Sequence, residues 1–303
     1  MTNAADGAAA RVMARQHALI TLEQARVVGF SRGMIHDRVT SGWWIRFGGA
    51  VYGAAGSERT HLQRGLAACL IAGPGAVVSH KWASAIIWEY SGVRSGRVDI
   101  LVPQGRSTRN AIARVHRTVD LPTSDVTVRH GVPVTRPART LFDLSGVVSL
   151  TTLEEAVDDA LCRRLTSLDE IQARLTALAS PGRASNNLRR VLEAWDPGPL
   201  PANVREMRVF RSLVAHGFPR PSRQHVIRDS RGRFVARVDL AFVPERIGLE
   251  VHSRRWHATP RGLARDERRE ARIRAAGWDV RWCEPDDIPY SSIGNALRAA
   301  RAA

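Results

Sequence analysis

The chain has 303 residues, of which 44% are hydrophobic, and it carries a net charge of +16. This length is enough for two or three domains with packed cores. The three cysteines lie far apart with no CxxC pair, which argues against a disulfide framework and a zinc knuckle, and the apolar run at 65–78 is broken by Gly-Pro-Gly. We therefore expect a cytoplasmic protein without a signal peptide or membrane span.

The positive charge is concentrated in the last third of the chain. Residues 201–303 carry 21 arginines and 12 acidic residues, a net charge of +9. Only one of the 45 basic residues is lysine, Lys81, which is typical of a GC-rich genome that encodes arginine in place of lysine. Such codon usage explains why the basic residues are arginines, but it does not explain why Asp and Glu are few. Because a basic surface binds polyanions by releasing their counterions, we expect double-stranded DNA as the partner.

Residues 1–60 contain the pattern of a small DNA-binding head. Thr21 and Ser31 are suitable N-caps for two short helices, and Gly29-Phe30 lies between them. Two short helices joined by a tight glycine turn predict a helix-turn-helix, and the following residues 43–52 predict a hairpin about Gly48-Gly49. The segment therefore predicts a winged helix-turn-helix domain.

This head resembles the N-terminal region of AbiEi-type antitoxins, which regulate bacterial toxin–antitoxin operons. The resemblance rests on Ile20-Thr21, Ala25, Gly29-Phe30-Ser31, Gly42 and Gly49-Ala50-Val51-Tyr52. It implies that the second helix enters the major groove and presents Arg32, His36 and Arg38. The alternative is a protein–protein module, since winged helices also serve that purpose.

Residues 61–196 predict a middle domain of α/β type. Strands are expected at 98–102 and 113–116, and one helical stretch at 149–178. The segments 78–80 and 131–143 also resemble AbiEi-type proteins. We expect His80 to be a hydrogen-bonded structural residue and assign no catalysis here. The Pro- and Gly-rich stretch 196–201 predicts the last domain boundary.

The last domain, residues 202–303, contains a predicted hairpin with acidic residues on one face. In 234–242 one alternation is apolar throughout and the other contains Arg237 and Asp239. In 247–252, Ile247, Leu249 and Val251 share one face, and Glu250 and His252 share the other. Period-two geometry therefore predicts that Asp239, Glu250 and His252 gather on the face opposite the apolar core.

Two carboxylates brought together repel each other unless a cation neutralises them, and Mg²⁺ or Mn²⁺ prefers such oxygen ligands. We expect Asp239 and Glu250 as the metal ligands. The metal would activate water for phosphodiester hydrolysis, with His257 as general acid or base. The alternative is an exposed polar sheet face on which Arg237 neutralises Asp239.

The pattern of Asp239 followed by Glu250-Val251-His252 resembles the PD-(D/E)xK nucleases. Residues 206–287 are similar to small domains related to very short patch repair endonucleases, on the basis of Glu206, Pro221, Gln224, Trp256-His257, Asp266, Arg269 and 277–282. The resemblance implies a restriction-endonuclease-like α/β/α domain with Glu206, Asp239, Glu250, His252 and His257 as catalytic residues. The chain departs from the usual motif in having His252 where lysine is expected, and it lacks the cysteines of the repair enzymes' structural zinc.

An arginine-rich helix is predicted at 261–276. Acids three and four residues away offset part of its charge, so most of these arginines are expected to be solvated. We expect Arg265 and Arg269 to contact DNA phosphates.

Taken together, the sequence predicts an α+β multidomain protein and leaves two functions open. The first is a metal-dependent DNA endonuclease or nickase held on the duplex by a winged-helix head. The alternative is a non-catalytic antitoxin-like transcriptional regulator of a toxin–antitoxin or phage-defence operon, with a toxin protein as partner. A phosphate-handling enzyme of another class is disfavoured because the chain contains no P-loop.

Overall fold

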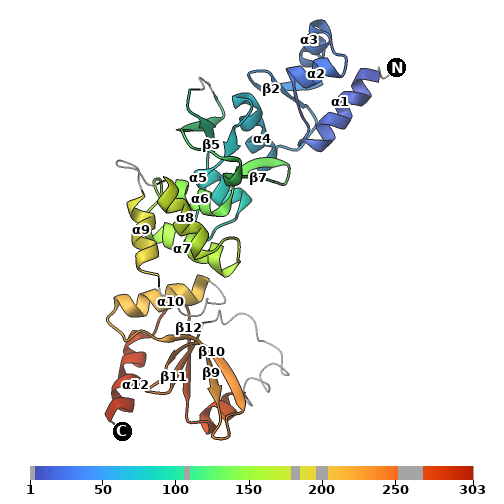
Figure 1. Cartoon of the computed structure of the whole chain (residues 1–303). Helices are drawn as coiled ribbons and strands as arrows, with labels where there is room; N and C mark the ends of the chain where they lie inside the picture. Colours follow the sequence, from blue (N-terminus) through green and yellow to red (C-terminus); the bar gives the residue numbers. More distant parts are fainter. Residues whose placement is uncertain (1–3, 106–109, 179–184, 196–203, 252–268, 303) are drawn as a thin grey trace. The chain divides into compact units, whose positions relative to one another are not determined.

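The computed structural model describes residues 4–105, 110–178, 185–195, 204–251 and 269–302. These residues form a mixed α+β protein with three separate sheets (Figure 1). The chain divides into two compact units, one of Met1–Val157 with Thr166–Glu193 and one of Asp158–Leu165 with Ala194–Ala303. The finer division at residues 60 and 196 stays a prediction.

The first unit begins with three helices and a three-stranded antiparallel sheet of order β1-β3-β2. The elements are α1 (Ala4–Arg15), β1 (Leu19–Thr21), α2 (Leu22–Val27), α3 (Arg32–Thr40), β2 (Trp44–Gly48) and β3 (Val51–Ala54). Both predicted N-caps are confirmed: Thr21 forms a capping box with Gln24, and the Ser31 hydroxyl accepts from the Met34 amide. Gly29, just after the end of α2, has a φ of 101°, which glycine adopts easily.

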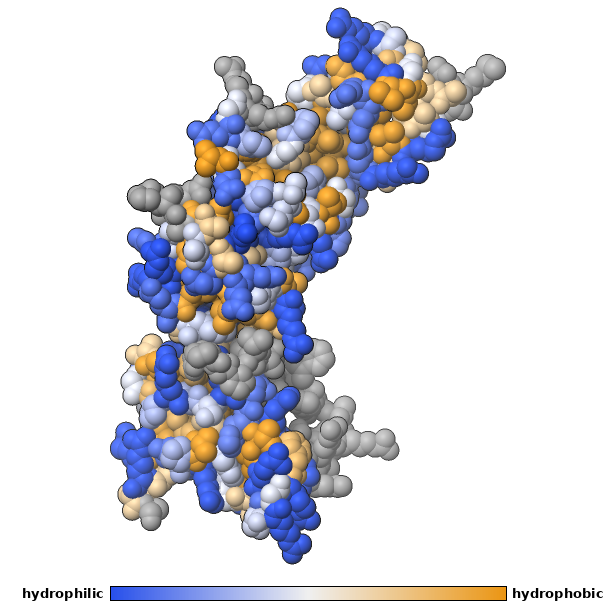
Figure 2. Space-filling view, viewed as in Figure 1, coloured by the Kyte–Doolittle hydropathy of each residue, from blue (hydrophilic) through white to orange (hydrophobic). Residues whose placement is uncertain are grey.

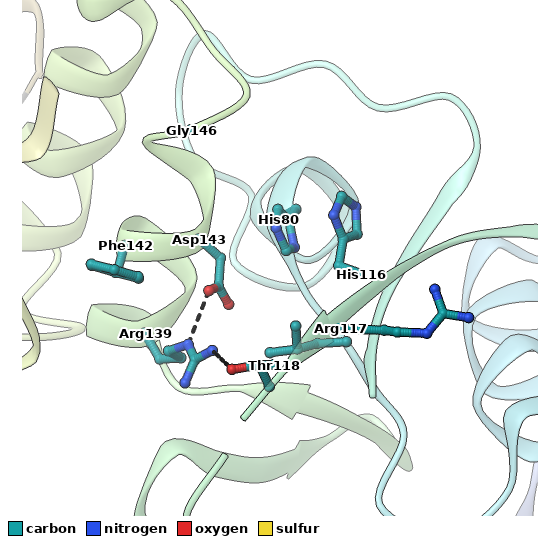
Figure 3. A pocket seen from close by; sticks show the side chains of 9 residues that line it. His80, His116, Arg117, Thr118, Arg139, Phe142, Asp143 and Gly146 are labelled. Carbon is teal, nitrogen blue, oxygen red and sulfur yellow. Dashed lines mark hydrogen bonds and ion pairs between the residues drawn. The ribbon is translucent and has the colours of Figure 1, made fainter. Parts of the chain in front are cut away.

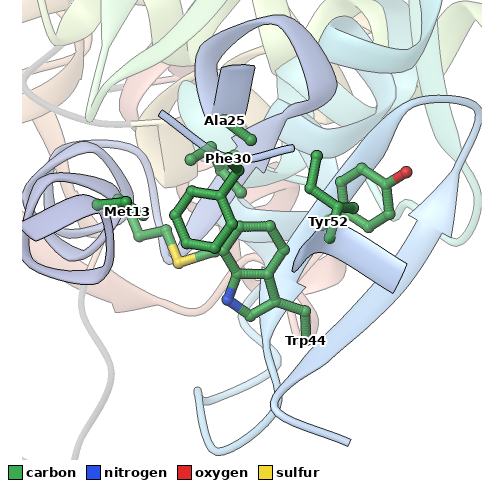
Figure 4. Close-up of a cluster of buried hydrophobic side chains, with 9 residues drawn as sticks. Met13, Ala25, Phe30, Trp44 and Tyr52 are labelled. Carbon is green, nitrogen blue, oxygen red and sulfur yellow. The ribbon is translucent and has the colours of Figure 1, made fainter. Parts of the chain in front are cut away.

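A small aromatic cluster holds this head together (Figure 4). The rings of Phe30 and Trp44 lie 4.9 Å apart between centroids, and those of Trp44 and Tyr52 lie 6.0 Å apart. Met13 of α1 and Ala25 of α2 belong to the same buried cluster. The turn after α2 and both strands of the hairpin are thereby fixed to one core, which gives α3 a rigid support.

The middle of the first unit is a five-stranded mixed sheet of order β6-β5-β4-β8-β7. Its strands are β4 (Val77–Val78), β5 (Val98–Pro103), β6 (Ala113–Thr118), β7 (Val126–Arg129) and β8 (Val132–Thr135). The pairs β5–β6 and β4–β8 are parallel, whereas β4–β5 and β7–β8 are antiparallel. The predicted strands at 98–102 and 113–116 are confirmed.

Helices accompany this sheet: α4 (His61–Ala72), α5 (His80–Trp82), the π-helical turn η1 (Ala83–Ile87), the 3₁₀ turn η2 (Thr123–Asp125), α6 (Pro137–Leu144), α7 (Leu150–Cys162), α8 (Leu168–Leu178) and α9 (Asn186–Glu193). The prediction of one helical stretch at 149–178 was wrong, because Arg164 has a φ of 53° and interrupts it. Ser167 then caps a new helix by accepting from the Glu170 amide while Glu170 accepts from the Ser167 amide.

The second unit contains a four-stranded sheet of order β12-β11-β10-β9. Its elements are α10 (Val204–Ala215), β9 (Ser222–Arg228), β10 (Phe234–Phe242), β11 (Ile247–Val251), a helix at 269–275, β12 (Asp279–Cys283) and α12 (Tyr290–Ala302). Strands β9, β10 and β11 are antiparallel neighbours, and β12 adds in parallel to β11. Helix α10 packs on β10 and β11.

The predicted apolar face of β10 needs one correction. Strict alternation over 234–242 places Phe234 in the apolar series that faces the core, but 64% of its surface is exposed while Val235 is buried. The cause is a register irregularity between Phe234 and Ala236, where the pairing with β9 shifts by one residue. The five residues of β11 are also all buried, so the strand has no exposed polar face.

Within the described ranges, none of the helices has the length and apolarity needed to cross a membrane. Hydrophilic residues are spread over the visible face of each unit (Figure 2).

Candidate functional sites

The first candidate site is the outer surface of α3 in the head. Arg32 is the first residue of this helix, and both Arg32 and His36 are exposed. Ile35, one position before His36, is buried in the aromatic cluster, so the helix is anchored on one side and open on the other. An anchored helix with exposed basic residues near its start is able to present them to DNA.

Arg38, the third residue predicted to contact DNA, has a partner within the head. Its guanidinium donates to both carboxylate oxygens of Asp6, at 2.7 Å from Nη2 to Oδ2 and 3.1 Å from Nε to Oδ1. This two-point ion pair joins α1 to α3. Arg38 therefore holds α3 against α1, and a DNA contact by this residue stays a prediction.

The second candidate site is a row of polar side chains across the C-terminal sheet. The β10–β11 pairing ends at Leu240 and Leu249, so the next residue of each strand, Asp239 and Glu250, lies across from the other. The pairing of Leu240 with Arg223 sets Asp239 opposite Gln224 in the same way. Directly opposite residues share one face of an antiparallel sheet, so strand register aligns these three side chains.

Hydrogen bonds tie this row to α10. The Gln224 amide nitrogen donates to Oε2 of Glu206 at 2.7 Å and to Oδ1 of Asp239 at 3.3 Å. Oδ2 of Asp239 accepts from the Val251 amide at 2.8 Å. Gln224 has a φ of 49°, a strained value for a residue with a side chain. The resemblance alone predicts Glu206 and Asp239 in one site, and in the structure the Gln224 side chain links these two residues.

An arginine forms an ion pair with Glu250. Arg269, the first described residue of the helix at 269–275, forms an ion pair with Oε1 of Glu250 and donates to the Arg237 carbonyl oxygen at 3.0 Å. Glu206 is 2% exposed and Glu250 is 3% exposed, so the alternative of an exposed polar face was wrong at Glu250. Neutralisation of Asp239 by Arg237 stays a prediction. Among the described residues, no three His, Cys, Asp or Glu side chains gather as metal ligands would.

Three predicted site residues, His252, His257 and Arg265, lie outside the described residues.

A third cluster, which we did not predict, lies in the middle of the first unit around Arg139 of α6 (Figure 3). Arg139 is 2% exposed and donates to Oδ1 of Asp143 at 2.9 Å and to Oδ2 of Asp125 at 3.1 Å. Asp143 also accepts from the Ser79 hydroxyl at 2.6 Å. Burial raises the pKa of the Asp143 carboxyl, and Arg139 and Ser79 oppose that shift.

A cavity of about 230 Å³ opens beside this network, and two stacked histidines border it. The rings of His80 and His116 lie 3.6 Å apart, and His116 Nε2 lies 3.0 Å from Oδ1 of Asp99. Burial, together with the charge of the neighbouring His116, lowers the pKa of His80 to about 3. His80 Nδ1 is buried without a hydrogen-bond partner among the described residues, so the expected hydrogen-bonded role of His80 is not seen at that atom.

A signal for this network was present in the sequence. Arg139 and Asp143 lie four residues apart in the segment 131–143, so on a helix they are close enough to form an ion pair. Pro137 in this segment is explained by its place at the start of the helix, but the start of a helix does not explain a buried arginine. Asp125, which contacts Arg139, and Ser79, which contacts Asp143, come from separate elements, and their approach to α6 depends on the order of the strands in the sheet.

Comparison with known proteins finds a family match in the part of the chain that contains Arg139. Residues 89–194 match the family model of the AbiEi antitoxin C-terminal domain. Two uncharacterized proteins, MT2308 and Rv2248, from two strains of Mycobacterium tuberculosis are each 26% identical over 264 residues, which cover 85% of this chain and 93% of the relative. The crystal structure of the Rv2827c protein of the same species aligns with 64% of this chain and 78% of its own, at 16% identity and a TM-score of 0.42. The middle of the chain is thus similar to the AbiEi antitoxin C-terminal domain.

Proposed function

We propose that the protein is a DNA-binding regulator of antitoxin type. The observation that carries the proposal is the match of residues 89–194 to the AbiEi antitoxin C-terminal domain. This domain suggests a toxin protein as partner of the middle of the first unit.

The head in front of it supplies a DNA-binding element. Helices α2 and α3, the turn at Gly29 and the β2–β3 hairpin follow each other as in a winged helix-turn-helix. We assign the DNA contact to Arg32 and His36, which are exposed on α3.

The head is tested by the double variant Arg32→Gln/His36→Gln. The probes are a labelled duplex from upstream of the protein's own gene and a mixed-sequence duplex. A lost base contact costs about 1–3 kcal/mol of discrimination, so the preference for the first duplex should fall by roughly tenfold or more. The matched control, Arg189→Gln/Arg190→Gln, changes two exposed arginines on α9. An unchanged preference in the α3 variant would refute recognition by this helix.

A second candidate function is a DNA endonuclease of the C-terminal unit, favoured by the row of Glu206, Gln224, Asp239 and Glu250. Carboxylates are the ligand type that Mg²⁺ or Mn²⁺ prefers, and Asp239 and Glu250 would hold such an ion, which supplies an activated water. The described contacts do not fit an open metal site, however. Arg269 already faces Glu250, and Gln224 and the Val251 amide already occupy the oxygens of Asp239. Nicking of supercoiled plasmid that Asp239→Asn abolishes would establish this function.

A further inference from the structure

A groove lined by arginines runs beside the hairpin of the head, outside the residues assigned above to DNA recognition. Its volume is about 650 Å³, and it is lined by Phe47 of β2 and by four arginines: Arg46, Arg59, Arg64 and Arg97. None of the described residues that line it is acidic. Four positive charges around one hollow repel each other, so such a groove is expected to have an anionic occupant.

Three of the arginines of this groove are held by uncharged partners. The Arg59 guanidinium lies 4.5 Å from the centroid of the Phe47 ring, and that of Arg46 lies 5.6 Å from the Tyr52 ring. The Arg97 guanidinium donates to the Ala111 carbonyl oxygen at 2.9 Å. Aromatic faces and carbonyl oxygens orient a guanidinium without cancelling its charge.

In the part of the chain that the structure describes, none of these four arginines forms an ion pair with a carboxylate. The contrast within the same unit is clear, because Arg38 pairs with Asp6, Arg139 with Asp125 and Asp143, and Arg174 with Asp125. All four groove arginines are exposed. The groove therefore combines oriented guanidiniums with uncompensated charge, which is the arrangement that binds phosphates.

The hairpin itself is fixed at this position. A Cβ added to Gly48, at the turn of the hairpin, would lie 3.1 Å from Cδ1 of Ile71 on α4, so the turn packs against that helix. The hairpin thus presents Arg46 and Phe47 of β2 beside Arg59, Arg64 and Arg97 as one surface. This surface joins the head to the start of β5 at Val98 and the segment before β6.

We propose that this groove binds the phosphate backbone of duplex DNA and so extends the DNA contact from the head onto the middle of the first unit. The inference rests on the proposed DNA-binding function. The groove contributes affinity and salt dependence but no sequence preference, because phosphate contacts carry no base information.

The test is the salt dependence of binding to a mixed-sequence duplex by the full chain carrying Arg59→Gln/Arg97→Gln. Each lost phosphate contact removes about 0.9 from the slope of log K against log salt, so the double variant should lose about two. Between 50 and 200 mM salt, its loss of affinity should be roughly tenfold smaller than that of the wild type. The charge-matched control Arg189→Gln/Arg190→Gln should keep the wild-type slope.

Three results would overturn the proposal that the groove binds DNA. The first is a slope for Arg59→Gln/Arg97→Gln equal to that of the control. The second is an unchanged DNA affinity with weakened binding of poly-L-glutamate, which would assign the groove to an acidic protein. The third is no duplex binding by the wild type, which also refutes the proposed function. The two proposals can also fail separately. If Arg32→Gln/His36→Gln loses sequence preference while Arg59→Gln/Arg97→Gln keeps the wild-type slope, DNA recognition by the head is supported and DNA binding by the groove is refuted.

Discussion

Arg139→Ala should lower the free energy of unfolding of the first unit by about 3–5 kcal/mol, the usual cost of removing one partner from a buried ion pair. Arg139 is 2% exposed and faces both Asp125 and Asp143, which are themselves buried. It also donates to the Asp120 carbonyl oxygen at 2.8 Å. Alanine leaves two carboxylates and a carbonyl without this donor. Urea denaturation followed by tryptophan fluorescence measures the loss.

Two further variants make this result specific. Arg189→Ala removes an exposed arginine of α9 and should change the unfolding free energy by no more than about 0.5 kcal/mol. Asp143→Asn added to Arg139→Met should recover part of the loss, since the buried carboxylate is then neutral. A loss below about 1 kcal/mol in Arg139→Ala would show that the network does not hold the unit together.

Arg269→Met should destabilise the second unit by about 3 kcal/mol, because it removes an ion-pair partner of the buried Glu250. The row then presents Asp239 and Glu250 without the Arg269 guanidinium, and two carboxylates in register attract a divalent cation. We expect Mn²⁺ to raise the melting temperature of Arg269→Met and to leave that of the wild type unchanged. Differential scanning calorimetry with and without Mn²⁺ measures both effects.

The control is Arg272→Met on the same helix, since Arg272 is exposed. This variant should melt like the wild type at every Mn²⁺ concentration. If Mn²⁺ stabilises the wild type as strongly as Arg269→Met, a metal already competes with Arg269, and the endonuclease becomes the better interpretation of this row.

The head was predictable because its signals are local. Thr21 and Ser31 each bond to a backbone amide three residues later, and Gly29 has the positive φ that its turn requires. The break at Arg164 was also signalled locally by Ser167 and Glu170, but the continuous helical pattern on either side hid it.

The C-terminal row was predictable in part. The four-residue turn at 243–246 fixes the register, and register alone brings Asp239 opposite Glu250. Arg269 is 19 residues beyond Glu250, and no periodicity links the two positions. The shift at Phe234 was missed because strict alternation contains no information about bulges. The groove arginines come from four segments that only the packed unit places together.

The most direct test of the proposed function is to incubate the purified chain with supercoiled plasmid and Mn²⁺ over a range of salt and to follow both mobility and cutting on a gel. A DNA-binding regulator shifts the plasmid, releases it steeply as salt rises and leaves it supercoiled. Open-circular or linear product that requires Mn²⁺ and disappears in Asp239→Asn would contradict the regulator and make the C-terminal row an active site.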